Sequence, residues 1–179
     1  INLMNILLIY EKKISGVNTI GKLIETKINN KIKITSFHTT ENYIDFLIDK
    51  KSLISHLFID SFLYRFVIFL DILKINILSK KINIIHCVNE ISSPIGYYLK
   101  KKKSIKFVIT IHANYSKYLY KKKYHKMAFD NSDKIISVSN FTKEYFLKFA
   151  NLRDKVTTLI TGVDNDIFYK LRDVKKENQ

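Results

Sequence analysis

Residues 3–10 read LMNILLIY, a nearly unbroken apolar run with β-branched side chains. Such a run predicts a strand that is buried on both faces, as in parallel sheets covered by helices. The pattern then breaks around Ser15 and Gly16, and apolar residues recur at helical spacing over 17–28. A second strand is expected at 31–37. The order strand, helix, strand is the repeating unit of an α/β fold.

The same alternation resumes after a long helical stretch. Residues 41–80 are expected to be mostly helical, with one dense helix over 52–78 that is apolar on nearly every side and therefore packed between layers. Further strands are predicted at 82–88, 106–113, 134–138 and 155–161, and helices at 94–103, 115–129 and 141–150. Repeated units of this length need right-handed crossovers, so the predicted fold is a single-domain, doubly wound, mostly parallel, Rossmann-like α/β sheet. Its ligands are expected beyond the carboxyl ends of the strands, where the strand order reverses.

Length and composition narrow the classes of protein. The 179 residues suffice for one domain, and a 46% share of hydrophobic residues is enough for a core. A single cysteine excludes a disulfide framework and favours a reducing, cytoplasmic setting. The chain begins at Ile1 without an initiator methionine, so a piece of something longer is one interpretation. The apolar stretch 53–78 is interrupted by Asp60, Arg65 and Asp71, which excludes a membrane span there.

The charge balance of the chain is strongly positive. Thirty-one Lys and Arg against 16 Asp and Glu give +15, which favours anionic partners. No recognised nucleic-acid motif accompanies this charge, so no nucleic-acid partner is expected. Short basic runs at 100–103 and 121–123 are interleaved with tyrosines. Such helices can lie on an anionic membrane surface, here the inner face of the membrane, but the same runs are common on solvated helix faces, and both interpretations stay open.

Residues 16–23, GVNTIGKL, nearly match the phosphate-binding loop G-x-x-x-x-G-K-[ST]. Leu23 stands where that motif needs a hydroxyl to hold magnesium, so a nucleotide hydrolase is only a third hypothesis. Gly16 is instead expected to let a ligand approach the first helix's N-terminus, where free amides favour an anion or a sugar hydroxyl. A simple tight turn is the alternative. Gly21 and Lys22 are then expected to have no special role.

Three histidines lie at or near the ends of predicted strands: His38, His86 and His112. Cys87 adjoins His86, but neighbouring residues on a strand point to opposite faces and no paired Cys or His spacing occurs, so no metal site is predicted. Cys87 is interpreted as a small buried hydrophobe. His112 ends the apolar run 107–111 and opens a loop, so we expect it to point into the crevice. The alternative is a structural histidine bonded to a backbone carbonyl.

Five segments in this order carry a further pattern: 4–10 with the glycine-bearing loop after it, 84–86, 108–112, 133–139, and Thr161-Gly162-Val163-Asp164 with Phe168. Together they resemble the N-terminal domain of family 4 retaining glycosyltransferases. This resemblance implies the GT-B architecture, in which two Rossmann-like domains face each other across a cleft. It implies an acceptor-side domain over 1–168, the start of an interdomain linker or tail over 169–179, and a C-terminal donor-binding domain that this sequence lacks.

The resemblance also implies roles by position. His112 resembles the histidine that lines the transferred sugar and is the candidate catalytic residue. Gly16 resembles the loop glycine near donor phosphate and acceptor, and Ser139 the serine that begins the next crevice loop. Gly162 and Asp164 resemble the segment that leads into the interdomain region. The remaining substrate-binding candidates are Ser15, Glu90 and Asn114.

Two departures from the family pattern stand beside these matches. The family usually has two adjacent glycines where Ser15 and Gly16 stand, and an asparagine where Thr161 stands. A serine in place of the first of these glycines restricts how closely the backbone of the first loop can approach a phosphate.

The leading hypothesis is the acceptor-binding half of a glycosyltransferase that moves a sugar from a nucleotide-sugar donor to a glycan or lipid-linked acceptor, in the synthesis of a polysaccharide or glycolipid. The resemblance implies no metal and no cofactor, since the nucleotide-sugar is a substrate. Without a donor-binding domain the chain alone is expected to be inactive. The alternative hypothesis is a non-catalytic Rossmann-like binding module attached to a membrane surface or a partner.

Overall fold

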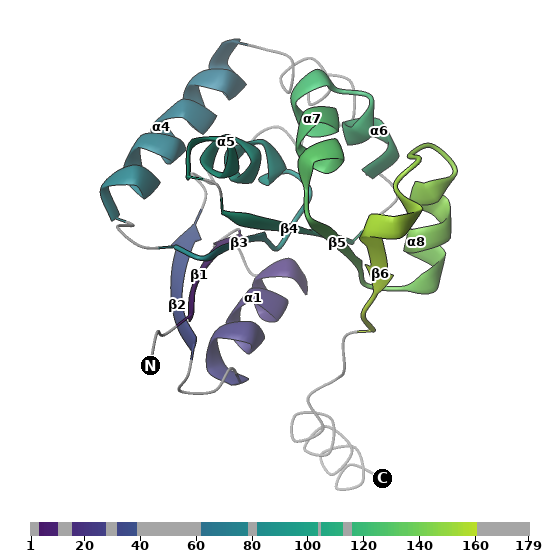
Figure 1. Cartoon of the computed structure of the whole chain (residues 1–179), viewed down its shortest axis with the longest axis horizontal. Helices are drawn as coiled ribbons and strands as arrows, with labels where there is room; N and C mark the ends of the chain where they lie inside the picture. Colours follow the sequence, from purple (N-terminus) through teal and green to yellow (C-terminus); the bar gives the residue numbers. More distant parts are fainter. Residues whose placement is uncertain are drawn as a thin grey trace, which may run out of the picture.

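A computed structural model of the chain describes residues 4–10, 16–27, 32–38, 62–78, 82–103, 105–112 and 116–160. Within these ranges the fold is a sheet with helices on both of its faces (Figure 1). The predicted sites Ser15, Asn114, Gly162 and Asp164, the domain boundary at 168 and residues 52–61 of the dense helix lie outside the described residues.

Six parallel strands form the sheet in the described part of the chain, in the spatial order β2-β1-β3-β4-β5-β6. They are β1 (Met4–Tyr10), β2 (Ile32–His38), β3 (Ile84–Cys87), β4 (Lys106–Ile111), β5 (Lys134–Ser137) and β6 (Val156–Thr158). The chain runs outward from β1 to β2 and then continues from the other side of β1 at β3. The strand order therefore reverses between β1 and β3, and the predicted doubly wound parallel sheet is confirmed.

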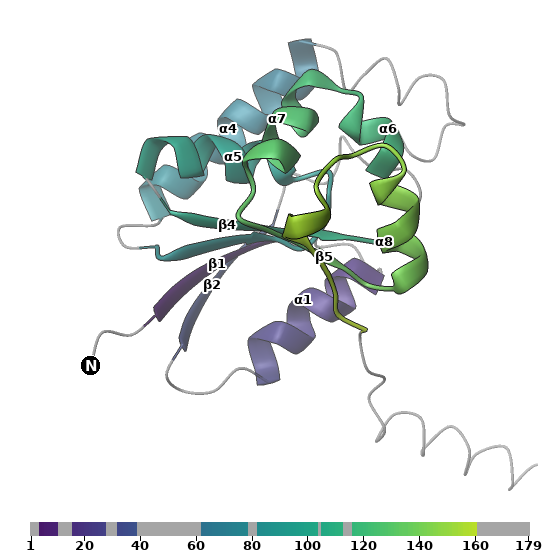
Figure 2. The same cartoon turned by 45° about the vertical axis from the view of Figure 1, so that its right-hand side comes forward.

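The described helices are α1 (Gly16–Lys27), α4 (Phe62–Leu78), α5 (Ser93–Lys103), α6 (Ser116–Tyr120), α7 (Lys123–Asn131) and α8 (Asn140–Leu147), with a 3₁₀ turn η1 (Arg153–Lys155). Helix α1 covers one face of the sheet, whereas α4, α5 and α7 cover the other (Figure 2). Both faces of the central strands are thereby removed from water, which is why their sequences read as apolar runs.

The apolar side chains of strand β1 alternate between two hydrophobic clusters. Leu7 and Ile9 belong to the large apolar cluster on the side of α4, α5 and α7. Leu8 and Tyr10 belong to the smaller cluster into which α1 packs. Successive side chains of a strand point to opposite faces, so every second residue enters the same core. Each fully buried aliphatic side chain stabilises the fold by roughly 1.5–3 kcal/mol.

Helix α1 packs closely against β1 at Gly21. The expectation that Gly21 has no special role is therefore wrong. A Cβ at Gly21 would lie 2.8 Å from the ring of the buried Tyr10, so only glycine lets the helix approach this closely. The Tyr10 hydroxyl donates a hydrogen bond of 2.9 Å to Glu25 Oε1. Burial, with this carboxylate, raises the pKa of Tyr10 to about 12.

One predicted helix and one predicted strand also need correction. The helix expected over 115–129 is two helices, because α6 closes with i→i+3 bonds, from Lys121 N–H to the Tyr118 carbonyl and from Lys122 N–H to the Leu119 carbonyl. The last strand covers only residues 156–158, and the other element ends shift by one to a few residues.

Helix α4 is not packed on all sides, contrary to the prediction from its all-round apolar sequence. Ile72 and Ile75 are buried against the sheet side, and with Ile68 they belong to the large core cluster. A second set of apolar side chains at helical spacing is exposed: Phe66, Phe69, Leu70 and Leu73. The helix therefore buries one stripe and leaves another at the surface.

Candidate functional site

The carboxyl ends of β1, β3, β4 and β5 form a continuous rim. The Val88 N–H donates to the Ile9 carbonyl over 2.9 Å, and the Val138 N–H donates to the Ile111 carbonyl over 3.3 Å. These bonds extend the ladders one residue past the strand ends. The residues that follow β3, β4 and β5 are therefore fixed relative to one another, at the edge where ligands bind in open α/β sheets.

His112 follows β4 directly and is held at two points. Its backbone N–H donates to Glu90 Oε1 over 2.9 Å, and its Nε2 lies 2.7 Å from the Val88 carbonyl oxygen. A carbonyl can only accept, so Nε2 carries the hydrogen of this bond. This bond to a backbone carbonyl is the one expected of a structural histidine. It occupies only Nε2, one of the two ring nitrogens. Within the described part of the chain no hydrogen bond uses Nδ1.

Glu90, in the segment between β3 and α5, is fully buried. Its Oε1 accepts from the His112 backbone and from the Ser116 hydroxyl, over 2.9 Å and 2.8 Å. It therefore joins the residues after β3 to both ends of the segment between β4 and α6. No sequence pattern singles out Ser116, because a lone serine at the start of a helix is common. The Val88 carbonyl is a backbone group that no side-chain pattern could reveal.

His86 sits inside the same region, on β3. Its Nε2 is hydrogen-bonded to Thr110 Oγ1 at 2.7 Å. Burial, together with the nearby charge of His112, lowers the pKa of His86 to about 4. The ring is therefore neutral at physiological pH and acts as a fixed polar support on the sheet.

Cys87 lies on the opposite side of β3 from His86, within the large apolar cluster. It is fully buried, as expected for a small hydrophobe, and burial raises the pKa of its thiol to about 12. Among the described residues no group of three or more His, Cys, Asp or Glu side chains is arranged to hold a metal ion.

Two helices begin at this rim. Gly16 is the first residue of α1, which follows β1, and Ser139 is the N-cap of α8, which follows β5. The Ser139 Oγ accepts from the Thr142 N–H over 3.0 Å. Helix N-termini present free amides that favour anions and hydroxyl oxygens.

The phosphate-loop pattern does not form a loop. Residues 17–22 are helical, and the exposed Lys22 lies in the second turn of α1. A phosphate-binding loop must instead wrap its amides around the phosphates before the helix starts. The arrangement therefore speaks against the nucleotide-hydrolase hypothesis.

Comparison with solved structures identifies the class of fold. The chain matches a crystal structure of Anabaena HepE in complex with UDP at a TM-score of 0.54 and 11% identity, covering 92% of this chain and 46% of that one. It matches HepE in complex with UDP and glucose at a TM-score of 0.52 and 10% identity, covering 90% and 45%. The chain thus spans less than half of HepE. It has the Rossmann-like fold of one half of a GT-B glycosyltransferase.

The family follows from the sequence. A sequence model of Glycosyltransferase Family 4 matches residues 48–167, more than half of the chain. The chain belongs to this family, as its motifs indicated. A search of curated proteins found no match. None of the helices described is both long and apolar enough to cross a membrane.

Proposed function

We propose that this chain is the acceptor-side half of a glycosyltransferase that moves a sugar from a nucleotide-sugar donor to a glycan or lipid-linked acceptor. Family membership and the half-GT-B fold support this proposal. The complexes of HepE with UDP and with UDP and glucose are consistent with such a donor. The observation that carries the proposal is the anchoring of His112 at the strand rim by Val88 and Glu90, in which no described residue forms a hydrogen bond with Nδ1.

His112 has the geometry of a residue that orients a sugar. Because Nε2 donates to the Val88 carbonyl, Nδ1 can only accept when the ring carries a single proton, and a sugar hydroxyl is then a suitable donor. The carbonyl also strengthens Nδ1 as an acceptor by polarising the ring. Holding the sugar still against the acceptor hydroxyl converts a bimolecular encounter into an oriented one. We propose no catalytic base.

We propose that Glu90 is a positioning residue, because its Oε1 accepts from the His112 N–H and from the Ser116 hydroxyl. Gly16 and Ser139 stand at helix N-termini on the same rim. There we propose that backbone amides receive donor phosphate or sugar hydroxyls, together with the predicted residues Ser15 and Asn114.

The rest of the reaction belongs to a second lobe. The cations that neutralise the leaving phosphate are proposed to lie there, so that the acceptor-side domain over 1–168 is inactive alone. Gly162 and Asp164 would lead toward that lobe, with 169–179 as the start of the linker or tail. We place the reaction in the cytoplasm, in polysaccharide or glycolipid synthesis.

The test is transfer by the full-length protein from several nucleotide-sugars to glycan and lipid acceptors. His112→Ala is expected to lower kcat about 100-fold, since it removes a group that contacts the reacting sugar. Thermal unfolding of the variant serves as the control for folding. A folded His112→Ala protein with near-normal kcat would contradict the assigned role. No transfer to any acceptor would favour the non-catalytic binding module.

A further inference from the structure

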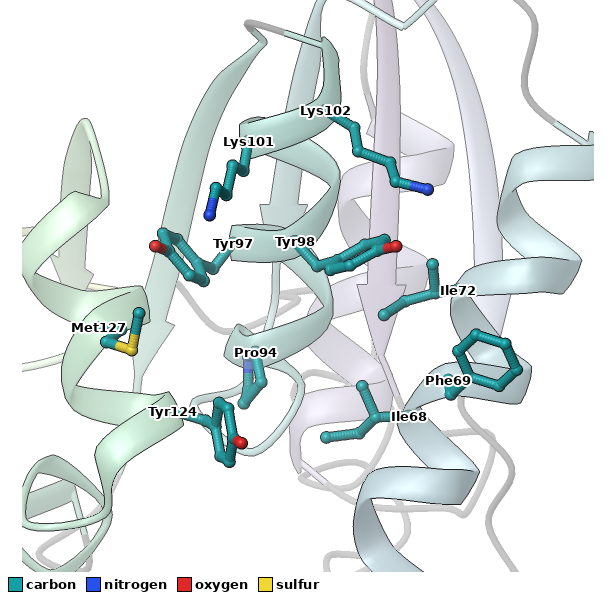
Figure 3. Close-up of a pocket in the computed structure, with 10 residues that line it drawn as sticks. All are labelled: Ile68, Phe69, Ile72, Pro94, Tyr97, Tyr98, Lys101, Lys102, Tyr124 and Met127. Carbon is teal, nitrogen blue, oxygen red and sulfur yellow. The ribbon is translucent and has the colours of Figure 1, made fainter.

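An apolar groove lies between α4, α5 and α7. It has a volume of about 600 Å³. Ile68 and Ile72 of α4 line one side, Tyr98 of α5 lies between, and Met127 of α7 lines the other (Figure 3). Every ionisable side chain in its described lining is a tyrosine or a lysine. The groove therefore combines an apolar floor with positive charge and no acidic group.

The exposed stripe of α4 continues this groove outward. Phe66, Phe69, Leu70 and Leu73 are 48%, 49%, 38% and 43% exposed, and Phe69 belongs to both the stripe and the groove. Isolated apolar side chains at a surface need no explanation, but four at helical spacing beside an apolar groove form a contiguous patch. We call the groove and this stripe together the α4–α5 surface.

The lysines gather at one end of the α4–α5 surface. Lys101 and Lys102 stand on the last turns of α5, above the tyrosine rings and away from the apolar end at Pro94 (Figure 3). Both are exposed, and neither makes an ion pair with another described residue. Lys102 Nζ lies 4.8 Å from the centre of the Tyr98 ring, a cation–π contact.

We infer that the α4–α5 surface docks on a bilayer that contains anionic phospholipid. At a membrane interface, apolar side chains contact the acyl region, tyrosine rings lie at the boundary, and lysines contact the headgroups. The α4–α5 surface presents its side chains in this order. A protein partner fits less well, because lysine is depleted in protein–protein interfaces. The net charge of +15 adds long-range attraction to an anionic surface. This inference does not rest on glycosyl transfer.

The experiment measures partition of the full chain onto phosphatidylcholine vesicles with and without phosphatidylglycerol. Stronger binding to the anionic vesicles, weakened by salt, is expected. Lys101→Gln/Lys102→Gln should weaken that binding about 10- to 30-fold, at roughly fivefold for each cation near the headgroups. The matched control is Lys33→Gln/Lys134→Gln, which removes the same charge from exposed positions on β2 and β5.

A second pair of variants tests the apolar part. Phe69→Ser/Leu73→Ser should weaken binding at least about tenfold, because these side chains leave water on docking. Phe141→Ser is its control, since Phe141 is 68% exposed on α8. Both sites are at the surface, and circular dichroism checks the fold.

Three outcomes would overturn the inference. They are equal binding to both vesicle types, controls that lose as much binding as the α4–α5 variants, and variants that bind like the wild type. A wild-type dimer that Phe69→Ser/Leu73→Ser dissociates, with no vesicle binding, would assign the surface to a second copy of the chain. The assay contains neither donor nor acceptor, so a protein that binds vesicles but transfers no sugar refutes the proposed function alone.

Discussion

At the scale of single residues, the lowered pKa of His86 makes the free energy of unfolding depend on pH. Its folded pKa of about 4 lies below the ordinary value of 6.5, because burial and the nearby charge of His112 disfavour the protonated ring. The unfolded chain therefore binds this proton first as the pH falls. The contribution of His86 to the free energy of unfolding is fully present above pH 6.5 and is lost as the pH falls toward 4.

We expect this loss to reach about 3 kcal/mol at most, at roughly 1.4 kcal/mol per pKa unit. His86→Gln should remove it, so the free energy of unfolding of the variant should fall less between pH 7 and pH 4 than that of the wild type, by up to about that amount. Urea unfolding across this pH range is the measurement. If both proteins lose stability in parallel, His86 is protonated in the folded chain and our assignment fails.

Glu90 is a second residue whose contribution is local. Glu90→Ala removes the buried carboxylate that accepts from the His112 N–H and from the Ser116 hydroxyl, and we expect a loss of about 2–4 kcal/mol in the free energy of unfolding. Glu90→Gln keeps an acceptor oxygen and should cost about 1 kcal/mol. Denaturant titration measures both.

Glu144→Ala provides the comparison for Glu90. Glu144 is an exposed carboxylate 3.9 Å from Arg153, and its removal should change stability by under about 0.5 kcal/mol. An equally small effect at Glu90 would mean that its two hydrogen bonds do not fix the start of the loop after β4.

At the scale of elements, the contact between α1 and β1 depends on the absence of a side chain. In Gly21→Ala the new methyl group would meet the Tyr10 ring, which is buried and tied to Glu25, so neither partner can move freely. We expect destabilisation of about 1–3 kcal/mol, the usual cost of overpacking. The neighbouring Lys22→Ala change, at an exposed position, should cost under about 0.5 kcal/mol.

Thermal or urea unfolding of the two variants separates these cases. A Gly21→Ala protein as stable as the wild type would show that α1 can shift on the sheet. Since the helix begins at Gly16, such a shift would also move the N-terminus that we place near the donor phosphate.

At the scale of the whole molecule, the single Cys87 reports on global opening. It lies in the centre of the sheet with no exposed surface, and burial raises its thiol pKa to about 12. Since the thiolate is the reactive form, a disulfide reagent at mildly alkaline pH should modify the native chain at least about 1,000-fold more slowly than the urea-unfolded chain. Rapid stoichiometric labelling of the native chain would instead indicate that β3 opens locally.

The candidate site was only partly predictable. His112 could be placed at a strand end because an apolar run stops there, and its placement after β4 is confirmed. The catalytic and binding roles assigned to it and to the other site residues remain predictions. Its anchoring could not be foreseen, because the Val88 carbonyl lies 24 positions away and Glu90 lies 22 positions away. Such contacts arise when β3 and β4 become neighbours in the sheet.

The sequence by itself determined the alternation of strands and helices, the parallel sheet and the family, because apolar runs buried on both faces leave few other arrangements. The tertiary structure alone decided that Gly21 must be small, that Nε2 of His112 is occupied by a carbonyl, and that one stripe of α4 stays exposed. The physical reason is the same in each case. Periodicity reports what one element prefers, whereas these features depend on which surface of another element lies opposite.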